Sequence, residues 1–591
     1  MPLPALPRIA DIAPHVAAGT LHAADVVEQV IARLEAYERI QPEVWISRFD
    51  NTTLCAMAAA IDARVAAGED LPLAGVPFAI KDNIDLAGLP TTAACPAFAY
   101  RPDASAHVVE RAIAAGALPV GKTNLDQFAT GLVGTRSPYG ACRAVHNRAY
   151  ISGGSSSGSA VAVAAGLVSF ALGTDTAGSG RVPAALNGLV GLKPSKGRWS
   201  SSGLVPACRT LDCITVLAHD VGDAALVDDC LVGFDAADPY SRRAPATVPT
   251  GMARIGIPLP HQRNFLGDLA SEALFDKAIE RMKALGVQII EVDINPLIEA
   301  AKLLYQGPWV AERTAAVSDM LRDTPQHIHP VVRDIVRSGL GMTAVDAFNG
   351  EYALRALARQ AEPVFEAVDA LLLPTCPTTY RLAEMLAAPF ALNANMGLYT
   401  NFVNLLDMAA IAVPAGFRAN ATGFGVTFIG PAFADRALLD LALAYQEIAP
   451  MPEIPAPDLT GVPQTVKLCV VGAHLAGMPL HWQLTSREAK LVARTHTAPD
   501  YRLYALAEST PPKPALVHAH GGTAIEVEVY ELDVAAFGSF VVDVPAPLAI
   551  GTVTLASGEV VKGFVSEPRA LDGATEITHL GGWRAYIASL A

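Results

Sequence analysis

The chain has 591 residues, of which 51% are hydrophobic and 17% charged, and its formal net charge is −15. This length predicts two or three domains with a sizeable core, and the apolar content excludes a disordered chain. No block of Lys and Arg stands out, so a nucleic-acid partner is not expected. A site for a small anion would need a specific local Arg or Lys.

The apolar segments are too short for a membrane-spanning helix. The longest, 160–172, is interrupted by Gly166 and Ser169 and falls short of the roughly 20 residues that such a helix needs. The stretch MPLPALPRIADIAPHV has no basic region followed by an apolar segment, so no signal peptide is expected. Eight scattered cysteines lack the spacing of a disulfide framework. Reduced thiols in the cytoplasm, and no membrane association, are predicted.

Helical and strand patterns alternate through the first 450 residues. Apolar residues at helical spacing predict helices at 22–39, 53–67, 107–116, 270–285, 297–322 and 344–368. Short apolar runs predict strands at 73–80, 117–121, 168–173, 186–192, 253–257, 288–292 and 370–373. This alternation is typical of an α/β fold with a largely buried sheet.

A proline-rich segment separates this region from the C-terminus. Five prolines fall within 449–463 without a periodic apolar pattern, which predicts a semi-rigid linker. Strands are expected at 466–471, 524–533, 539–543 and 551–555, with mixed signals at 481–494. The predicted organisation is a domain at 1–450, a linker at 451–466 and a small α+β domain at 467–591.

Lys81 ends the apolar strand LAGVPFAI and has two interpretations. A lysine at a strand end commonly extends its charged group to solvent. A buried lysine instead has a lowered pKa, and its neutral amine can act as a base.

Two clusters of Gly and Ser follow, and each has an ordinary interpretation as a loop or helix cap. Ser155 lies in GGSSSG, before residues that can form a helix, and Ser179 lies in TAGSG. Small residues around Ser179 let consecutive backbone N–H groups converge on one point, as in an oxyanion hole. The segment GSSSG also matches the G-x-S-x-G motif with Ser156 as nucleophile, but the residues before it do not form the strand that this motif requires.

Taken together, the motifs AIKDNID, GGSSSGS and GTDTAGSGRVPA resemble those of the amidase signature family, and further matches extend over 30–426. The resemblance implies a large mixed twisted sheet covered by helices on both faces. It also implies a Ser–cis-Ser–Lys triad for hydrolysis of linear amides. Ser179 would be the nucleophile, Ser155 (after a cis peptide bond) the proton relay, and Lys81 the base.

Within this resemblance, Thr176, Ala177, Gly178 and Ser179 would form the oxyanion hole. The sequence departs from the commonest family pattern in carrying Ser157 where glycine is usual, and Ala177 with Gly180 where Gly and Ile are usual. These departures leave the triad intact and narrow the assignment within the family.

A narrower resemblance is to the allophanate hydrolase group of that family. It rests on PEVWISR, ACRTLDC, DPYSRR, YQGPWVAERTA and YTNFVNLLDMAA, and on GAHLAGMPLHWQL with APDYRLYAL near the C-terminus. It implies hydrolysis of allophanate (urea-1-carboxylate) to ammonia and carbon dioxide. Gly131, Tyr305 and Arg313 would bind this substrate. The last two lie eight residues apart in an expected helical segment, hence on broadly one side. Without the resemblance, the sequence would favour a solvent-exposed helix arginine at Arg313.

The C-terminal segment resembles the gamma-glutamylcyclotransferase-like fold. There His474 follows an expected strand and is equally compatible with a structural role and with action on the carboxylated product. Two His-x-His pairs, at 327/329 and 518/520, do not make a zinc site without a third ligand, so neither metal nor cofactor is predicted.

Other functions stay open. The alternatives are another small-amide amidase, an amidotransferase subunit that passes ammonia to a partner, and a non-catalytic scaffold on the same fold. By resemblance a homodimer is expected, and a complex with other enzymes of the pathway is a further possibility. The sequence does not distinguish urea breakdown from triazine breakdown as the source of substrate.

Overall fold

The computed structural model describes residues 2–448, 465–507 and 509–590. The chain divides into two compact units, Met1–Leu459 and Thr460–Ala591, which are described separately. The predicted linker at 451–466 lies outside the described residues up to residue 464.

The first unit is built on one mixed sheet of eleven strands. In spatial order the strands are β1 (Trp45–Arg48), β3 (Leu118–Thr123), β2 (Pro77–Lys81), β4 (Phe170–Asp175), β6 (Cys213–Ala218), β5 (Val190–Lys193), β10 (Met408–Phe417), β11 (Gly423–Pro431), β9 (Ala370–Pro374), β7 (Arg254–Pro258) and β8 (Gln288–Val292). Strand β2 runs parallel to β3 and β4, and β7 runs parallel to β8 and β9. The other neighbouring pairs are antiparallel.

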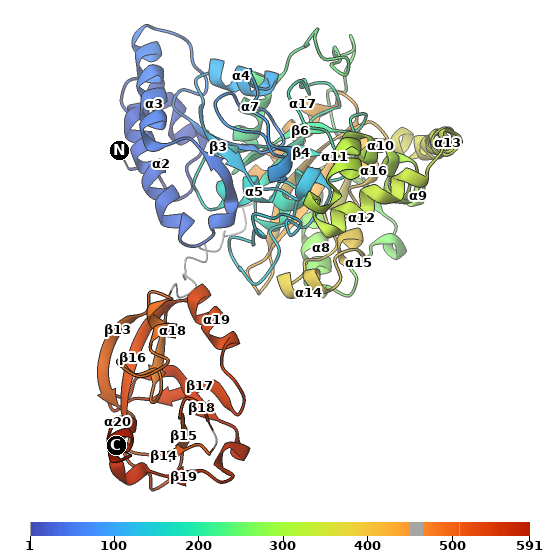
Figure 1. Cartoon of the computed structure of the whole chain (residues 1–591). Helices are drawn as coiled ribbons and strands as arrows, with labels where there is room; N and C mark the ends of the chain where they lie inside the picture. The colour runs from blue at the N-terminus through green and yellow to red at the C-terminus, as the bar shows by residue number, and fades with distance from the viewer. Residues whose placement is uncertain (1, 449–464, 508, 591) are drawn as a thin grey trace. The chain divides into compact units, whose positions relative to one another are not determined.

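Helices surround this sheet on both faces (Figure 1), as the resemblance implied. They are α1 (Ala13–Ala17), α2 (Ala23–Glu38), α3 (Asn51–Ala66), α4 (His107–Ala114), α5 (Ser157–Ala164), α6 (Arg181–Leu186), α7 (Val221–Leu231), α8 (Leu269–Ala284), α9 (Asn295–Gln306), α10 (Trp309–Ala316), α11 (Ser318–Asp323), α12 (Pro330–Ser338), α13 (Ala344–Ala367), α14 (Leu382–Ala387), α15 (Ala391–Met396), α16 (Phe402–Leu405) and α17 (Asp435–Glu447).

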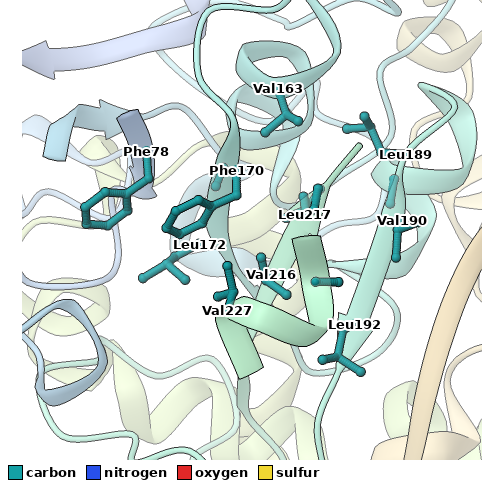
Figure 2. Close-up of a cluster of buried hydrophobic side chains, with 14 of the residues drawn as sticks. Phe78, Val163, Phe170, Leu172, Leu189, Val190, Leu192, Val216, Leu217 and Val227 are labelled. Carbon is teal, nitrogen blue, oxygen red and sulfur yellow. The ribbon is translucent and has the colours of Figure 1, made fainter. Parts of the chain in front are cut away.

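Aromatic and branched side chains from strands and helices form the hydrophobic core around the sheet (Figure 2). The rings of Phe78 on β2 and Phe170 on β4 stack with their centroids 5.0 Å apart, and both side chains are fully buried. Val163 from α5 and Val227 from α7 belong to the same buried cluster. Because β2 and β4 are parallel neighbours, their carboxyl ends meet at one edge of the sheet. Lys81 therefore emerges beside the end of β4.

In its described residues, 465–507 and 509–590, the second unit is β-rich and has three short α-helices. Its strands β12 (Thr465–Val470), β13 (Lys490–His496), β16 (Glu526–Asp533), β17 (Leu548–Thr554) and β18 (Val560–Ser566) form one sheet, and β14 (Tyr501–Ala505), β15 (Pro514–His518) and β19 (Thr575–Glu576) form another. The helices are α18 (Trp482–Thr485), α19 (Val534–Val542) and α20 (Trp583–Ser589).

Three sequence expectations need correction. The strand at 539–543 is wrong: its β-branched residues end helix α19, which buries Phe540 and leaves Val542 83% exposed. The strand expected at 186–192 starts only at Val190, because Leu186 still belongs to α6. The helical run at 297–322 is broken at Gly307 and Pro308, where α9 ends and α10 begins.

Candidate active site

Lys81 is the last residue of β2, and its side chain is fully buried. The Nζ atom donates to Ser155 Oγ at 2.7 Å and to Thr174 Oγ1 at 2.6 Å. Burial lowers the pKa of Lys81 to about 7, against the opposing attraction of nearby carboxylates. The solvent-exposed interpretation is therefore wrong, and the side chain has the properties of a buried base.

Ser155 lies at the entrance to α5 and follows a cis Gly154–Ser155 peptide bond, the geometry that the resemblance implied. Its side chain is buried, and its carbonyl accepts the backbone N–H groups of Asp126 and Ser157. A Cβ atom on Gly154 would collide with the carboxylate of Asp126. Glycine is therefore required at that position by close packing.

Ser179 lies in the turn between β4 and α6. Its hydroxyl donates to the carbonyl of Gly131 at 3.3 Å, and its own carbonyl accepts the N–H of Ser156 at 3.3 Å. The two serine loops predicted from the sequence thus lie side by side, and Gly131 contacts the hydroxyl of Ser179 through its backbone.

The turn at Ser179 is held by the buried carboxylate of Asp175. It accepts the N–H groups of Gly178 at 2.7 Å and Gly180 at 3.2 Å, and it forms a bidentate pair with Arg181 at 2.9 and 3.0 Å. The N–H of Gly178, one of the implied oxyanion donors, is therefore occupied. Within the described chain, the N–H groups of Thr176, Ala177 and Ser179 donate to no protein acceptor, so these three stay predicted donors.

Gly178 itself has φ of +127°, a backbone conformation that favours glycine, and a Cβ there would collide with Thr400 Oγ1. The hydroxyl of Thr176 donates to Asp212, whose pKa burial raises to about 6. Asp212 thus anchors the first residue of the implied oxyanion loop.

Asp126 organises the site, although nothing in the sequence singled it out. Its carboxylate accepts the backbone N–H groups of Val133 at 3.1 Å, Gly134 at 3.0 Å and Arg136 at 2.9 Å. Its own N–H donates to the carbonyl of Ser155 at 3.2 Å. It therefore ties the loop after Gly131 to the loop that carries Ser155. The only local signal is a short polar stretch after the strand at 117–121, in which Asp126 lies between Leu125 and Gln127.

Tyr305 and Arg313 meet, but not on one helix as the spacing suggested. Tyr305 belongs to α9 and Arg313 to α10, and the guanidinium lies 5.3 Å from the ring centroid of Tyr305. Arg313 is only 2% exposed and donates to Thr130 Oγ1 at 3.2 Å. The exposed-arginine interpretation is wrong: the helix is interrupted at Gly307 and Pro308, and Arg313 on the following helix reaches Thr130, in the loop around Gly131 (the Gly131 loop).

A cavity of about 460 Å³ adjoins this loop. Tyr305, Arg136 and Asn401 contribute to its lining, as does Asn393, whose Oδ1 accepts the N–H of Leu132 at 2.9 Å. The cavity has apolar walls with a few polar groups, which is the usual make-up of a small-molecule pocket.

His474 lies in the wall of a separate cavity of about 190 Å³ in the second unit. Its Nε2 lies 2.7 Å from Gln483 Oε1, and its ring stacks on Phe564 with the centroids 5.1 Å apart. Burial lowers the pKa of His474, so its neutral form is favoured. Lys513 and Asp543 line the same cavity.

All eight cysteines are free. Among residues 2–448, 465–507 and 509–590, no group of three or more His, Cys, Asp or Glu side chains is arranged to hold a metal ion. No helix in these ranges is both long and apolar enough to cross a membrane.

Comparison with known proteins identifies the class. The amidase family model matches residues 25–439, and the chain belongs to this family. A model of the allophanate hydrolase C-terminal domain matches residues 466–588.

Individual relatives narrow the assignment within the family. The solved allophanate hydrolase of Kluyveromyces lactis is 40% identical, with a TM-score of 0.70 and 99% of both chains covered. The urea amidolyase of Saccharomyces cerevisiae is 45% identical over 553 residues, which cover 88% of this chain and 30% of the relative. The chain thus spans about a third of that longer protein. One subunit of the glutamyl-tRNA(Gln) amidotransferase from Deinococcus deserti is 35% identical over 469 residues, which cover 73% of this chain and 94% of the relative.

Proposed function

We propose that this chain hydrolyses allophanate through Lys81, Ser155 and Ser179. The observation that carries the proposal is the buried amine of Lys81, bonded to Ser155 Oγ at 2.7 Å with its pKa lowered to about 7. A neutral amine in this place can accept a proton near neutral pH, which an ordinary surface lysine cannot.

In the proposed reaction, Ser179 Oγ attacks the terminal amide carbon while its proton passes through Ser155 to Lys81. The N–H groups of Thr176, Ala177 and Ser179 stabilise the oxyanion. The C–N bond then breaks, Lys81 returns a proton through Ser155, and ammonia leaves. Water releases the acyl group by the same proton path. The product, N-carboxycarbamate, loses carbon dioxide to give carbamate, which yields the second ammonia and carbon dioxide.

The substrate carboxylate supports the choice of allophanate over a neutral amide. Arg313 is buried beside the Gly131 loop, and a guanidinium can bind a carboxylate with two hydrogen bonds. The name and full-length overlap of the Kluyveromyces lactis relative support the same substrate.

Ammonia release from allophanate, malonamate, biuret and glutamine tests this function. We expect the highest kcat/KM with allophanate, and an acyl-enzyme trapped by hydroxylamine in the wild type but not in Ser179→Ala. Replacement of Arg313 by Ala should raise KM for malonamate far more than for its neutral counterpart malonamide. Equal losses on both amides, or preference for a neutral amide, would contradict the substrate assignment.

An ammonia-supplying amidotransferase subunit is the second candidate, favoured by the 35% identity to such a subunit from Deinococcus deserti. The match of residues 466–588 to the allophanate hydrolase C-terminal domain speaks against it. Glutaminase activity that appears only with a co-purified partner protein would favour this alternative.

For the second unit, we propose that His474 acts on the carboxylated product. Its support is the cavity with Lys513 and Asp543, where a carboxylate would meet a cation. Replacing His474 by Gln should slow carbon dioxide release while the first ammonia appears at the wild-type rate. If both rates are unchanged, including after deletion of 467–591, the unit serves structure or assembly.

We further propose a cytoplasmic homodimer that associates with other enzymes of the same pathway. The much longer urea amidolyase relatives, of which this chain matches about 30%, support a functional link to further activities. Light scattering on the purified chain distinguishes a dimer from a monomer.

A further inference from the structure

Two buried arginines converge on Thr130, the residue before Gly131. Arg136 donates from Nη1 to the carbonyl of Thr130 at 2.9 Å, and Arg313 donates from Nη1 to its hydroxyl at 3.2 Å. Arg136 is 1% exposed and Arg313 is 2% exposed. The sequence resemblance pointed to Arg313 but not to Arg136.

Neither guanidinium forms an ion pair with a carboxylate of the described chain. The Nε atoms of both side chains are buried and have no hydrogen-bond partner there. Burial, together with the positive charge of Arg313, lowers the pKa of Arg136. Asp126 opposes this effect, but its oxygens accept backbone N–H groups, including that of Arg136, and not the guanidinium. Against the effect of burial, Asp212 and Glu312 attract Arg313 from a distance and raise its pKa, but neither forms an ion pair with it. Buried charges are normally paired directly, so the two guanidinium groups leave a place for an anion.

The cavity beside the loop gives such an anion room. Arg136 and Tyr305 both line it, and the guanidinium of Arg313 lies over the Tyr305 ring. Asn401 also lines this cavity, and its Oδ1 is a buried acceptor without a partner among the described residues. The wall of the cavity thus carries the side chains of Arg136, Asn401 and the acidic Asp334, and Arg313 lies beside it on the far side of Tyr305. A small acid in the cavity would meet the guanidinium of Arg136.

We propose that Arg136 is a second carboxylate-binding side chain, which acts with Arg313 to select amides that carry a carboxylate. This inference deepens the proposed function and rests on it for the identity of the substrate. The competing explanation is structural, since Arg136 also donates to the carbonyl of Pro389 at 2.8 Å. A purely structural arginine would affect folding and all substrates alike.

Malonate binding separates these explanations, because it needs no turnover. By calorimetry on the full chain, Arg136→Gln should weaken malonate binding by about 10- to 100-fold, the range for a hydrogen bond to a charged group. Arg136→Lys should recover part of this loss. The control is Lys302→Gln, which removes one positive charge from the lining of the same cavity at a side chain that is 49% exposed. It should change the affinity by less than about threefold.

Kinetics add a second readout. In Arg136→Gln, KM for malonamate should rise about 10- to 100-fold more than KM for malonamide. Unchanged malonate affinity, or equal losses on both amides, would overturn the proposal. If Arg136→Gln does not fold, a crystal structure of the wild-type chain with malonate decides. Malonate oxygens bonded to Arg136 support the proposal, and malonate held by Arg313 alone overturns it.

Failure of the proposed function would look different. Arg136-dependent malonate binding in an enzyme that leaves allophanate intact would keep the carboxylate site and remove the proposed substrate. Efficient allophanate hydrolysis that is unchanged in Arg136→Gln would keep the proposed substrate and remove the proposed role of Arg136.

Discussion

The buried amine of Lys81 makes stability depend on pH in a way that a substitution can isolate. Burial lowers its pKa from 10.5 to about 7, so the unfolded chain binds more protons than the folded chain between these values. Stability must therefore rise with pH across this window. Since a tenfold change corresponds to about 1.4 kcal/mol, burying Lys81 costs about 5 kcal/mol well below pH 7 and about 2 kcal/mol at pH 9. Relative to a Lys81→Met variant, the wild-type chain should gain about 2–3 kcal/mol between pH 6 and pH 9.

Urea titrations of both proteins at the two pH values measure this difference. The hydrogen bonds from Lys81 to Ser155 and Thr174 are lost in the variant at either pH, so their contribution cancels to first order. Lys302→Met, which removes a half-exposed lysine, should show no comparable pH dependence. In the wild type, kcat/KM should increase with pH up to about 7 and then level off, whereas Lys81→Met should be inactive. The same stability difference at both pH values, or a rate that climbs until about pH 10, would refute a buried neutral base.

Three further substitutions test the scaffold of the site. Asp126→Asn should reduce kcat at least about tenfold, because three backbone N–H groups lose a charged acceptor. The KM for malonamate should stay within about threefold of the wild-type value, and steady-state kinetics measure both constants. Gly178→Ala should lower both activity and melting temperature. Adding Thr400→Ala should recover only part of each, since it removes the contact with Oγ1 but leaves the close contact with Cβ of residue 400 and the φ of +127°. Lys122→Met removes the partner of buried Asp82 at 3.3 Å and should destabilise the chain by about 3–5 kcal/mol; a loss below about 1 kcal/mol in denaturant titrations would contradict this.

The sequence could predict the groups proposed to react, because each lies in a local motif that resembles the amidase signature family. Lys81 ends an apolar strand, and the two serines lie in small-residue loops, so their positions follow from short-range patterns. The supporting groups could not be predicted in this way. Asp126 accepts backbone N–H groups, and such bonds do not depend on the side chains of the residues that donate them. The sequence therefore carries no pattern that marks this role. The binding role proposed for Arg136 depends on its place in a cavity, and the other residues that line this cavity are more than 150 positions away in the sequence.

The long hairpin of β10 and β11 shows the same limit for the fold. These strands occupy the middle of the sheet and join β5 to β9, yet the sequence pattern predicts neither. Both are almost fully buried, so they lack the alternation of apolar and polar residues that marks a half-exposed strand. The strand predicted at 539–543 is wrong for the opposite reason, since its β-branched run favours a strand locally while tertiary packing makes it helical.

The residues proposed to react and the residues proposed to bind the substrate lie on different parts of the fold. The groups proposed to react lie at the ends of adjacent strands β2 and β4 and in the turns beside them, where a packed sheet holds them in place. The groups proposed to bind the carboxylate lie on α9, α10 and the Gly131 loop, outside the sheet. Arg136 and Arg313 donate to Thr130 and not to Lys81, Ser155 or Ser179, so changes at these arginines should alter which amide is bound more than how it is cleaved. Retention of the pH dependence of kcat in an Arg313→Ala variant, measured with a neutral amide, is the expected consequence.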